Sequence, residues 1–170
     1  GIRHLICYSR AMDTRNQMAE RYNRARELAE NRKFDDAAAL LEEVLAVDAD
    51  SLRALDLLGY VEYFRGFPDR GENCCRRALA IDPDHVYALK GLGLCLAAQG
   101  QVDEGVRSLE RAIALNPAWP DARWDLAVVL IRANRPMAAI EVLRRAAMDI
   151  PHMMERFTRL MQQAQAKLKS

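Results

Sequence analysis

The chain has 170 residues, 51% of them hydrophobic, which is enough for one well-buried domain or one short solenoid and argues against disorder. Its 25 basic and 24 acidic residues nearly cancel, so it lacks the uniform field of a dedicated nucleic-acid binder or a polybasic membrane anchor. No apolar run approaches the roughly 20 residues that cross a bilayer. We therefore expect no nucleic acid partner, and membrane association only through another protein.

Residues 1–17 do not match the repeat pattern of the remaining chain, because the positions that should hold small residues fall on Arg3 and Arg10. Three interpretations of this N-terminal segment remain open. It is a vector remnant, a helix that extends the first repeat backwards, or an arm that docks on another copy of the chain. The last interpretation predicts a homo-oligomer through residues 1–17.

From Met18 onward a pattern of apolar and small residues returns every 34 residues. It ends in a proline in the last three copies, whereas the first copy is degenerate and has Ala49 in that place. The clearest copy is Leu89, Leu92, Gly93, Leu96, Gly105, Leu109, Ala112 and Pro117; one period earlier lie Leu55, Leu58, Gly59, Glu62, Gly71, Cys75, Ala78 and Pro83, and one period later Arg123, Leu126, Ala127, Leu130, Ala139, Leu143, Ala146 and Pro151. A fixed period of this length indicates a repeat array. We divide it into units at 18–51, 52–85, 86–119 and 120–153.

Each unit contains two apolar runs with helical spacing, separated by a polar break, and is therefore predicted to be a helical hairpin. We expect Asp35, Asp69 and Asp103 to cap the second helices. Pro68 and Pro136 are expected at the start of a helix, where the missing N–H has no helical partner in any case.

Glycines inside the predicted helices indicate where the two helices of a hairpin cross closely. Gly59 is expected to face Gly71, and Gly93 to face Gly105. A glycine within a helix costs about 1 kcal/mol relative to alanine, so four of them need a packing reason.

The two ends of the array depart from the pattern, as terminal repeats must when one side faces water. In the first unit Arg21 and Arg24 occupy positions that hold leucine in the second and third units, so this face is expected to meet water or a partner. Residues 154–170 carry one apolar stripe, which predicts a capping helix. The stripe consists of Phe157, Leu160, Met161, Ala164 and Leu168.

The repeat resembles the tetratricopeptide repeat family, whose 34-residue helix-turn-helix unit ends near a proline. The resemblance implies an all-α fold: a solenoid in which hairpins wind into a right-handed superhelix, closed by the C-terminal capping helix. It also implies a concave groove, lined by the first helix of each unit, that binds a protein or peptide segment. In this chain the groove positions hold Tyr22, Arg26, Arg53, Asp56, Tyr60, Tyr63, Tyr87, Lys90, Trp124 and Arg132.

Four of the five tyrosines in the sequence fall on these groove positions. Aromatic residues and arginine carry most of the binding energy at protein interfaces. We expect Tyr60, Tyr63, Tyr87, Lys90 and Trp124 to form the centre of the groove. The alternative is that the rings fill gaps between first helices and that the cations form a solvated, salt-bridged surface.

Sequence motifs for chemistry are missing. His4, His85 and His152 are scattered, and the four cysteines lack the paired spacing of a zinc site. The cysteines are expected to be buried thiols that serve packing. We therefore predict a protein that is not an enzyme and that needs no metal and no cofactor.

Three short segments give a narrower resemblance, to members of the family that coat the magnetosome, a bacterial organelle. These segments are Leu40-Leu41-Glu42, Asp69-Arg70-Gly71 and Leu92-Gly93-Leu94. The leading hypothesis is a cytoplasmic, non-enzymatic scaffold that binds a partner segment in its groove. The alternatives are a self-assembling coat on the magnetosome surface and an accessory module of a larger enzyme or secretion complex.

Overall fold

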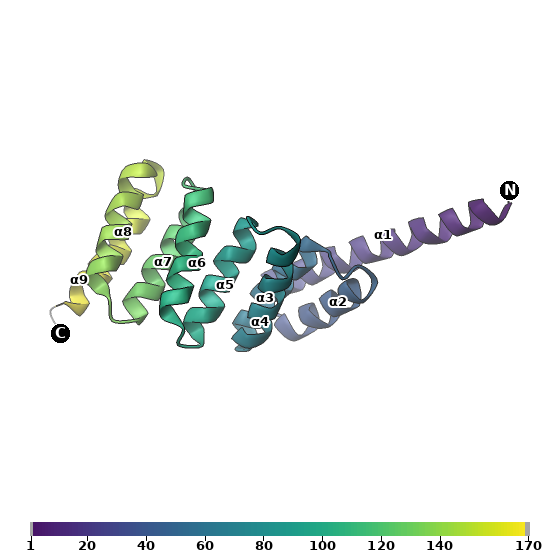
Figure 1. The fold of residues 1–170 in the computed structure, drawn as a ribbon, viewed down its shortest axis with the longest axis horizontal. Helices are drawn as coiled ribbons and strands as arrows, with labels where there is room; N and C mark the ends of the chain where they lie inside the picture. Colours follow the sequence, from purple (N-terminus) through teal and green to yellow (C-terminus); the bar gives the residue numbers. More distant parts are fainter. Residues whose placement is uncertain (1, 169–170) are drawn as a thin grey trace. The chain divides into compact units, whose positions relative to one another are not determined.

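A computed structural model describes the backbone of residues 2–168 and the side chains of residues 12–168. Within these residues the regular structure is entirely helical (Figure 1), which confirms the predicted all-α class. The helices are α1 (Ile2–Glu30), α2 (Phe34–Val47), α3 (Leu52–Arg65), α4 (Pro68–Ile81), α5 (Val86–Ala98), α6 (Val102–Leu115), α7 (Pro120–Arg132), α8 (Pro136–Asp149), the 3-10 turn Pro151–Met153 and α9 (Met154–Lys167).

The chain divides into two compact units, which we call the N-terminal unit (Gly1–Ile81) and the C-terminal unit (Asp82–Ser170). In the N-terminal unit α1 packs on α2, α2 on α3, and α3 on α4. In the C-terminal unit the same sequential packing runs from α5 to α9. Each unit is thus a stack of helical hairpins, as the 34-residue period predicts for a solenoid.

One turn geometry closes the first helix of all four hairpins. Arg32, Gly66, Gly100 and Asn134, spaced by one period, all have positive φ, between 57° and 86°. In each hairpin the amide N–H of the following residue donates to the carbonyl oxygen five residues before it, as Gln101 does to Leu96 at 2.9 Å. This is a Schellman-type helix end, in which a left-handed residue lets the chain reverse.

The predicted capping role of the aspartates is wrong. Lys33 and Gln101 occupy the N-cap positions of α2 and α6, and neither helix has a side-chain capping hydrogen bond. Asp35, Asp69 and Asp103 instead lie in the first turns of α2, α4 and α6. There their charge is favourable because helix N-termini carry a partial positive charge.

The crossing glycines lie where the period predicts. A Cβ added to Gly93 would lie 2.8 Å from the carbonyl oxygen of Gly105, and a Cβ added to Gly59 would lie 3.5 Å from that of Gly71. Within the second hairpin, and likewise within the third, the two helices therefore approach each other backbone to backbone at these glycines.

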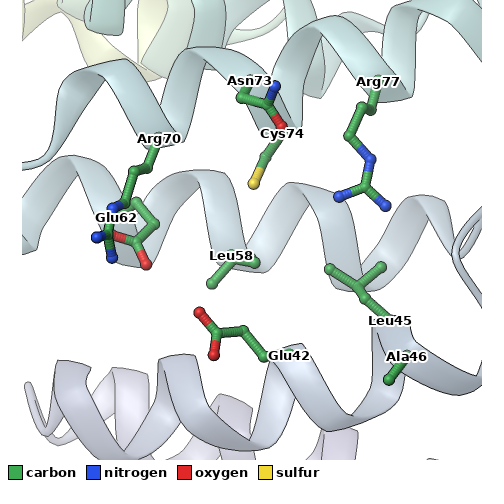
Figure 2. A pocket seen from close by; sticks show the side chains of 9 residues that line it. All are labelled: Glu42, Leu45, Ala46, Leu58, Glu62, Arg70, Asn73, Cys74 and Arg77. Carbon is green, nitrogen blue, oxygen red and sulfur yellow. The ribbon is translucent and has the colours of Figure 1, made fainter.

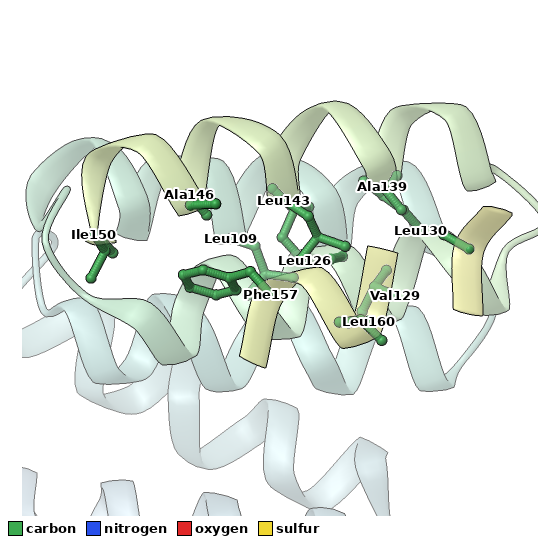
Figure 3. Close-up of a cluster of buried hydrophobic side chains, with 13 residues drawn as sticks. Leu109, Leu126, Val129, Leu130, Ala139, Leu143, Ala146, Ile150, Phe157 and Leu160 are labelled. Atoms are coloured by element: carbon green, nitrogen blue, oxygen red, sulfur yellow. The ribbon is translucent and has the colours of Figure 1, made fainter. Parts of the chain in front are cut away.

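A capping helix closes the C-terminal unit, as predicted. Helix α9 packs on α8, and the fully buried ring of Phe157 joins Leu109 and Leu143 in the core of this unit. Figure 3 shows the ring among these side chains. Cys74, Cys75 and Cys95 are buried, which agrees with a packing role.

Helix α1 is much longer than its hairpin partner. It has 29 residues and α2 has 14, so at 1.5 Å per residue they measure roughly 43 Å and 21 Å. Residues 2–17 continue the helix of the first repeat backwards, and about half of α1 extends past α2 (Figure 1). Among the described side chains of this half, Met12 to Gln17 are exposed.

Candidate functional site

Tyr22 and Arg53, both predicted groove residues, lie together in the N-terminal unit. The Arg53 guanidinium lies 4.2 Å from the centre of the Tyr22 ring, within the range of a cation–π contact. The contact joins α1 to α3, the first helices of two successive hairpins. Arg26 is also exposed on α1 and forms an ion pair along its own helix with Glu30 at 3.8 Å.

Four aromatic rings of the N-terminal unit form a continuous cluster. Phe64 contacts Tyr60, Tyr63 and Phe34 at centroid distances of 4.6, 5.1 and 5.7 Å. Tyr60 is 50% exposed and Phe64 47%, whereas Tyr63 is half-buried. We call these residues the N-terminal aromatic cluster. Asp56, also on α3, is half-buried.

Lys90 of the C-terminal unit is neutralised within the chain. Its ammonium nitrogen lies 3.1 Å from a carboxylate oxygen of Asp125 on α7 and 5.3 Å from the Trp119 ring centre. Tyr87, 59% exposed, contacts the same Trp119 ring at 4.9 Å. Lys90 is therefore salt-bridged, as the alternative interpretation of the groove cations expects, while the Tyr87 ring remains exposed.

Burial raises the pKa of Asp125 above its ordinary value, and the positive charge and hydrogen bond of Lys90 oppose that effect. Desolvation disfavours the charged carboxylate, and an opposite charge nearby favours it. The neighbouring carboxylate of Asp121 raises the pKa further. The Lys90–Asp125 ion pair is thus half-buried. Excluding more water from it would lower the local dielectric constant and strengthen the attraction between the two charges.

Trp124 lies on α7 and is half-buried beneath a cation from the capping helix. The Arg156 guanidinium lies 4.5 Å from its ring and also reaches Asp121 at 3.5 Å. Arg132, the last residue of α7, is exposed. The five predicted central residues therefore divide between the units: Tyr60 and Tyr63 belong to the N-terminal unit, and Tyr87, Lys90 and Trp124 to the C-terminal unit.

Sequence reasoning missed several partners of the predicted residues. Phe34 begins a second helix, Trp119 lies in the connector before α7, and Arg156 belongs to the capping helix. None of them falls on a first-helix position, so the repeat pattern gives no reason to select them. Trp119 was the most detectable, because tryptophan is enriched at protein interfaces and this one lies outside the helices that form the repeat core.

Within the described residues, no helix is long and apolar enough to cross a membrane. Nor does any group of three or more His, Cys, Asp and Glu side chains in this part of the chain have the geometry to hold a metal ion. The surface features of the described residues are aromatic rings and paired charges on stacked helical hairpins. These define a helical-repeat protein of the kind that presents side chains to other proteins.

Family comparisons identify the repeat. A family model described as tetratricopeptide repeat matches residues 96–168, and a second model with the same description matches residues 22–63 and 57–106. The chain belongs to the tetratricopeptide repeat family. Members of this family are in general protein-interaction scaffolds, and the repeat itself is typically a non-catalytic module.

Solved structures show the same fold. TTC0263, a tetratricopeptide repeat protein of Thermus thermophilus, is 16% identical with a TM-score of 0.74 over 88% of this chain and 87% of its own. MamA of Desulfovibrio magneticus is 18% identical with a TM-score of 0.68 over 77% and 74%. At these identities the likeness is one of fold. No curated protein matches the sequence.

A mutant O-GlcNAc transferase of Thermobaculum terrenum is 28% identical, with a TM-score of 0.71 over 77% of this chain. The matched part is only 26% of the transferase chain. The present chain thus spans about a quarter of that protein's length.

Proposed function

We propose that this chain is a non-enzymatic scaffold that binds a segment of a partner protein on its first helices, α1, α3, α5 and α7, in the concave groove expected of the family. The observation that supports the proposal is the set of exposed rings on these helices. Tyr60, Phe64 and Tyr87 expose about half of their surface or more, and Arg53 is exposed beside Tyr22. Rigid rings offer a large contact area at a small entropic cost.

The test is affinity capture with the wild type and with the double variant Tyr60→Ala/Tyr87→Ala. Both side chains expose about half of their surface, so the variant should stay folded, with only a small fall in its unfolding temperature from the lost ring contacts, while losing captured proteins. A control is Met148→Ala, which removes an apolar side chain that is 73% exposed from the second helix α8. Partners that remain bound to the double variant would contradict the proposal.

A second candidate function is self-assembly into a coat, in which residues 1–17 of one copy bind another. It is supported by the half of α1 that extends past α2. The fold shared with MamA agrees with it. On this proposal the coat lies on a cytoplasmic organelle surface such as the magnetosome. Deleting residues 1–17 should leave a monomer in light scattering, and an unchanged oligomer would overturn the candidate.

A third candidate is an accessory repeat module of a larger enzyme or secretion complex. Its support is the match to one quarter of the transferase chain. The complete reading frame tests it directly, because a catalytic or secretion domain beside the repeats would be evident in its sequence. A reading frame that contains only the repeats would contradict it.

A further inference from the structure

Glu62 breaks the repeat at a position that is otherwise leucine. The residues one period apart at this position are Leu28, Glu62, Leu96 and Leu130, and all four are buried. Only 2% of the Glu62 side chain is exposed. Because a buried charge costs several kcal/mol unless it is paired, this substitution needs a compensating interaction.

In the described part of the chain, only one of the two oxygens of the Glu62 carboxylate has a hydrogen-bond donor. Arg65, one turn later on α3, donates from Nη1 to Oε1 of Glu62 at 2.8 Å, and from Nε to Asp35 at 2.8 Å. The other oxygen, Oε2, is buried and accepts no hydrogen bond from the residues that the structure describes. A buried acceptor without a donor costs about 1–3 kcal/mol.

Glu62 lines a cavity of about 390 Å³ within the N-terminal unit, a volume within the roughly 300–1,000 Å³ range of small-ligand sites. Most of its lining comes from the second helices α2 and α4, so it differs from the first-helix surface described above. Figure 2 shows the carboxylates of Glu62 and Glu42 facing the same space. The lining residues are Glu42, Leu45, Ala46, Leu58, Glu62, Arg70, Asn73, Cys74 and Arg77.

The charges around the cavity are unequally satisfied. Arg77 donates to the carbonyl oxygen of Ala49 at 3.0 Å, and Arg70 lies over the Phe67 ring at 5.0 Å. Glu42, on α2, is exposed and forms no ion pair with another described residue. Among the carboxylates of the lining, Glu42 is therefore unpaired within the described residues, and Glu62 is paired, through Arg65, at one oxygen only. The neighbouring lining residues Leu45 and Leu58 are apolar.

We propose that this cavity binds an arginine or lysine side chain of a partner protein, with its cationic head between the carboxylates of Glu62 and Glu42. The aliphatic stem of such a side chain packs on Leu45 and Leu58, because long basic side chains bury their methylene groups. Charge-assisted hydrogen bonds to the two carboxylates supply the donors that the chain itself lacks. The site does not depend on binding at the first helices.

The test is an NMR titration of the full chain with acetyl-arginine amide and with its neutral counterpart, acetyl-citrulline amide. The arginine probe should shift the amide signals of Asn73 and Cys74, and citrulline should bind at least about tenfold more weakly, since charged hydrogen bonds are roughly twice as strong as neutral ones. Inorganic phosphate serves as a third probe, because two arginines also line the cavity. Equal binding of arginine and citrulline, no shift with arginine, or shifts at these residues with phosphate alone would overturn the proposal.

Two variants make the test specific to Glu62. Glu62→Gln removes the charge at constant size, and Glu62→Leu restores the leucine of the other three hairpins. Both should weaken arginine binding at least about tenfold, and Glu62→Leu should also raise the unfolding midpoint, as expected where a functional residue costs stability. The matched control is Glu43→Gln, because Glu43 is the next residue on α2 but pairs with Arg21 at 2.6 Å. Wild-type binding by Glu62→Gln, or an equal loss in the control, would refute the site.

Discussion

The second hairpin (α3 and α4) and the third hairpin (α5 and α6) use glycine at the same crossing, yet they differ in how tightly it is enclosed. A Cβ added to Gly93 would lie 2.6 Å from Cγ of Leu109, closer than real side chains approach. A Cβ added to Gly59 would lie 3.3 Å from Sγ of Cys75, which occupies the position equivalent to Leu109. The period thus fixes the position of the glycine, but the size of the side chain that faces it, Cys75 or Leu109, decides how much a larger residue at that position would destabilise the fold.

The largest expected difference is between Gly93→Ala and Gly59→Ala. Gly93→Ala should destabilise the fold by about 1–3 kcal/mol, the usual cost of overpacking a core, because Leu109 and the Gly105 carbonyl both obstruct the new methyl group. Gly59→Ala should stay within about 1 kcal/mol of the wild type, since the better helix propensity of alanine offsets a mild contact. Urea unfolding of the two variants measures both values. Equal losses would show that the backbone approach, rather than the facing side chain, sets the requirement.

The comparison can be sharpened by moving the tight partner into the second hairpin. The double variant Gly59→Ala/Cys75→Leu should be destabilised beyond the sum of the two single changes. Its new leucine would collide with the new methyl group, as Leu109 would in Gly93→Ala. A double-mutant cycle should give a coupling energy of about 0.5–3 kcal/mol, the range for residues in contact. Additive effects would contradict the assignment of the difference to this position.

The turns of the hairpins allow a smaller test. The second and third hairpins place Gly66 and Gly100 in the left-handed conformation, whereas the first and fourth place Arg32 and Asn134 there, with φ of 59° and 57°. A left-handed residue with a side chain costs roughly 1–2 kcal/mol, and asparagine tolerates it best. Arg32→Gly should therefore stabilise the fold by about 1 kcal/mol, and Asn134→Gly by less.

The measurement is the urea midpoint of each turn variant. Gly100→Ala provides the reverse change and should destabilise by about 1 kcal/mol, since nothing lies near enough to its added Cβ to cause a clash and only the backbone conformation is strained. A loss of stability in Arg32→Gly would mean that the arginine side chain contributes more than its conformation costs.

The period predicted the fold well because packing positions repeat. It placed the hairpins and the crossing glycines, and the apolar stripe after the last repeat placed the capping helix, because each follows from which residues must be apolar or small. It predicted the surface less completely. Phe34, Trp119 and Arg156 contact the predicted rings from a second helix, a connector and the cap, and such contacts depend on tertiary approach that no spacing within one repeat encodes. Glu62 was visible as an exception to leucine, but its unsatisfied oxygen required the positions of its neighbours.

The third hairpin also forms an ion pair with the fourth, between Asp103 and Arg135. Removing this pair should give the smallest of the predicted effects on stability. Arg135 donates to Asp103 at 2.6 Å, and this hydrogen bond, followed by the positive charge of Arg135, lowers the pKa of Asp103 below its ordinary value. Carboxyl NMR should find this lowered pKa in the wild type and a return toward the ordinary value in Arg135→Gln. Arg107→Gln is the control, because Arg107 contributes the smallest of the causes.

The sign of the pH dependence follows from that direction. A carboxyl group whose pKa is lower in the folded chain stabilises the fold above the pKa of the unfolded chain, and this contribution disappears as the pH falls through the folded value. The stability difference between the wild type and Arg135→Gln should therefore be present at neutral pH and vanish once Asp103 is protonated. The effect should be small and decrease with added salt, because the pair is exposed. A difference that persists unchanged at acid pH would show that Arg135 stabilises the turn by its packing rather than by its charge.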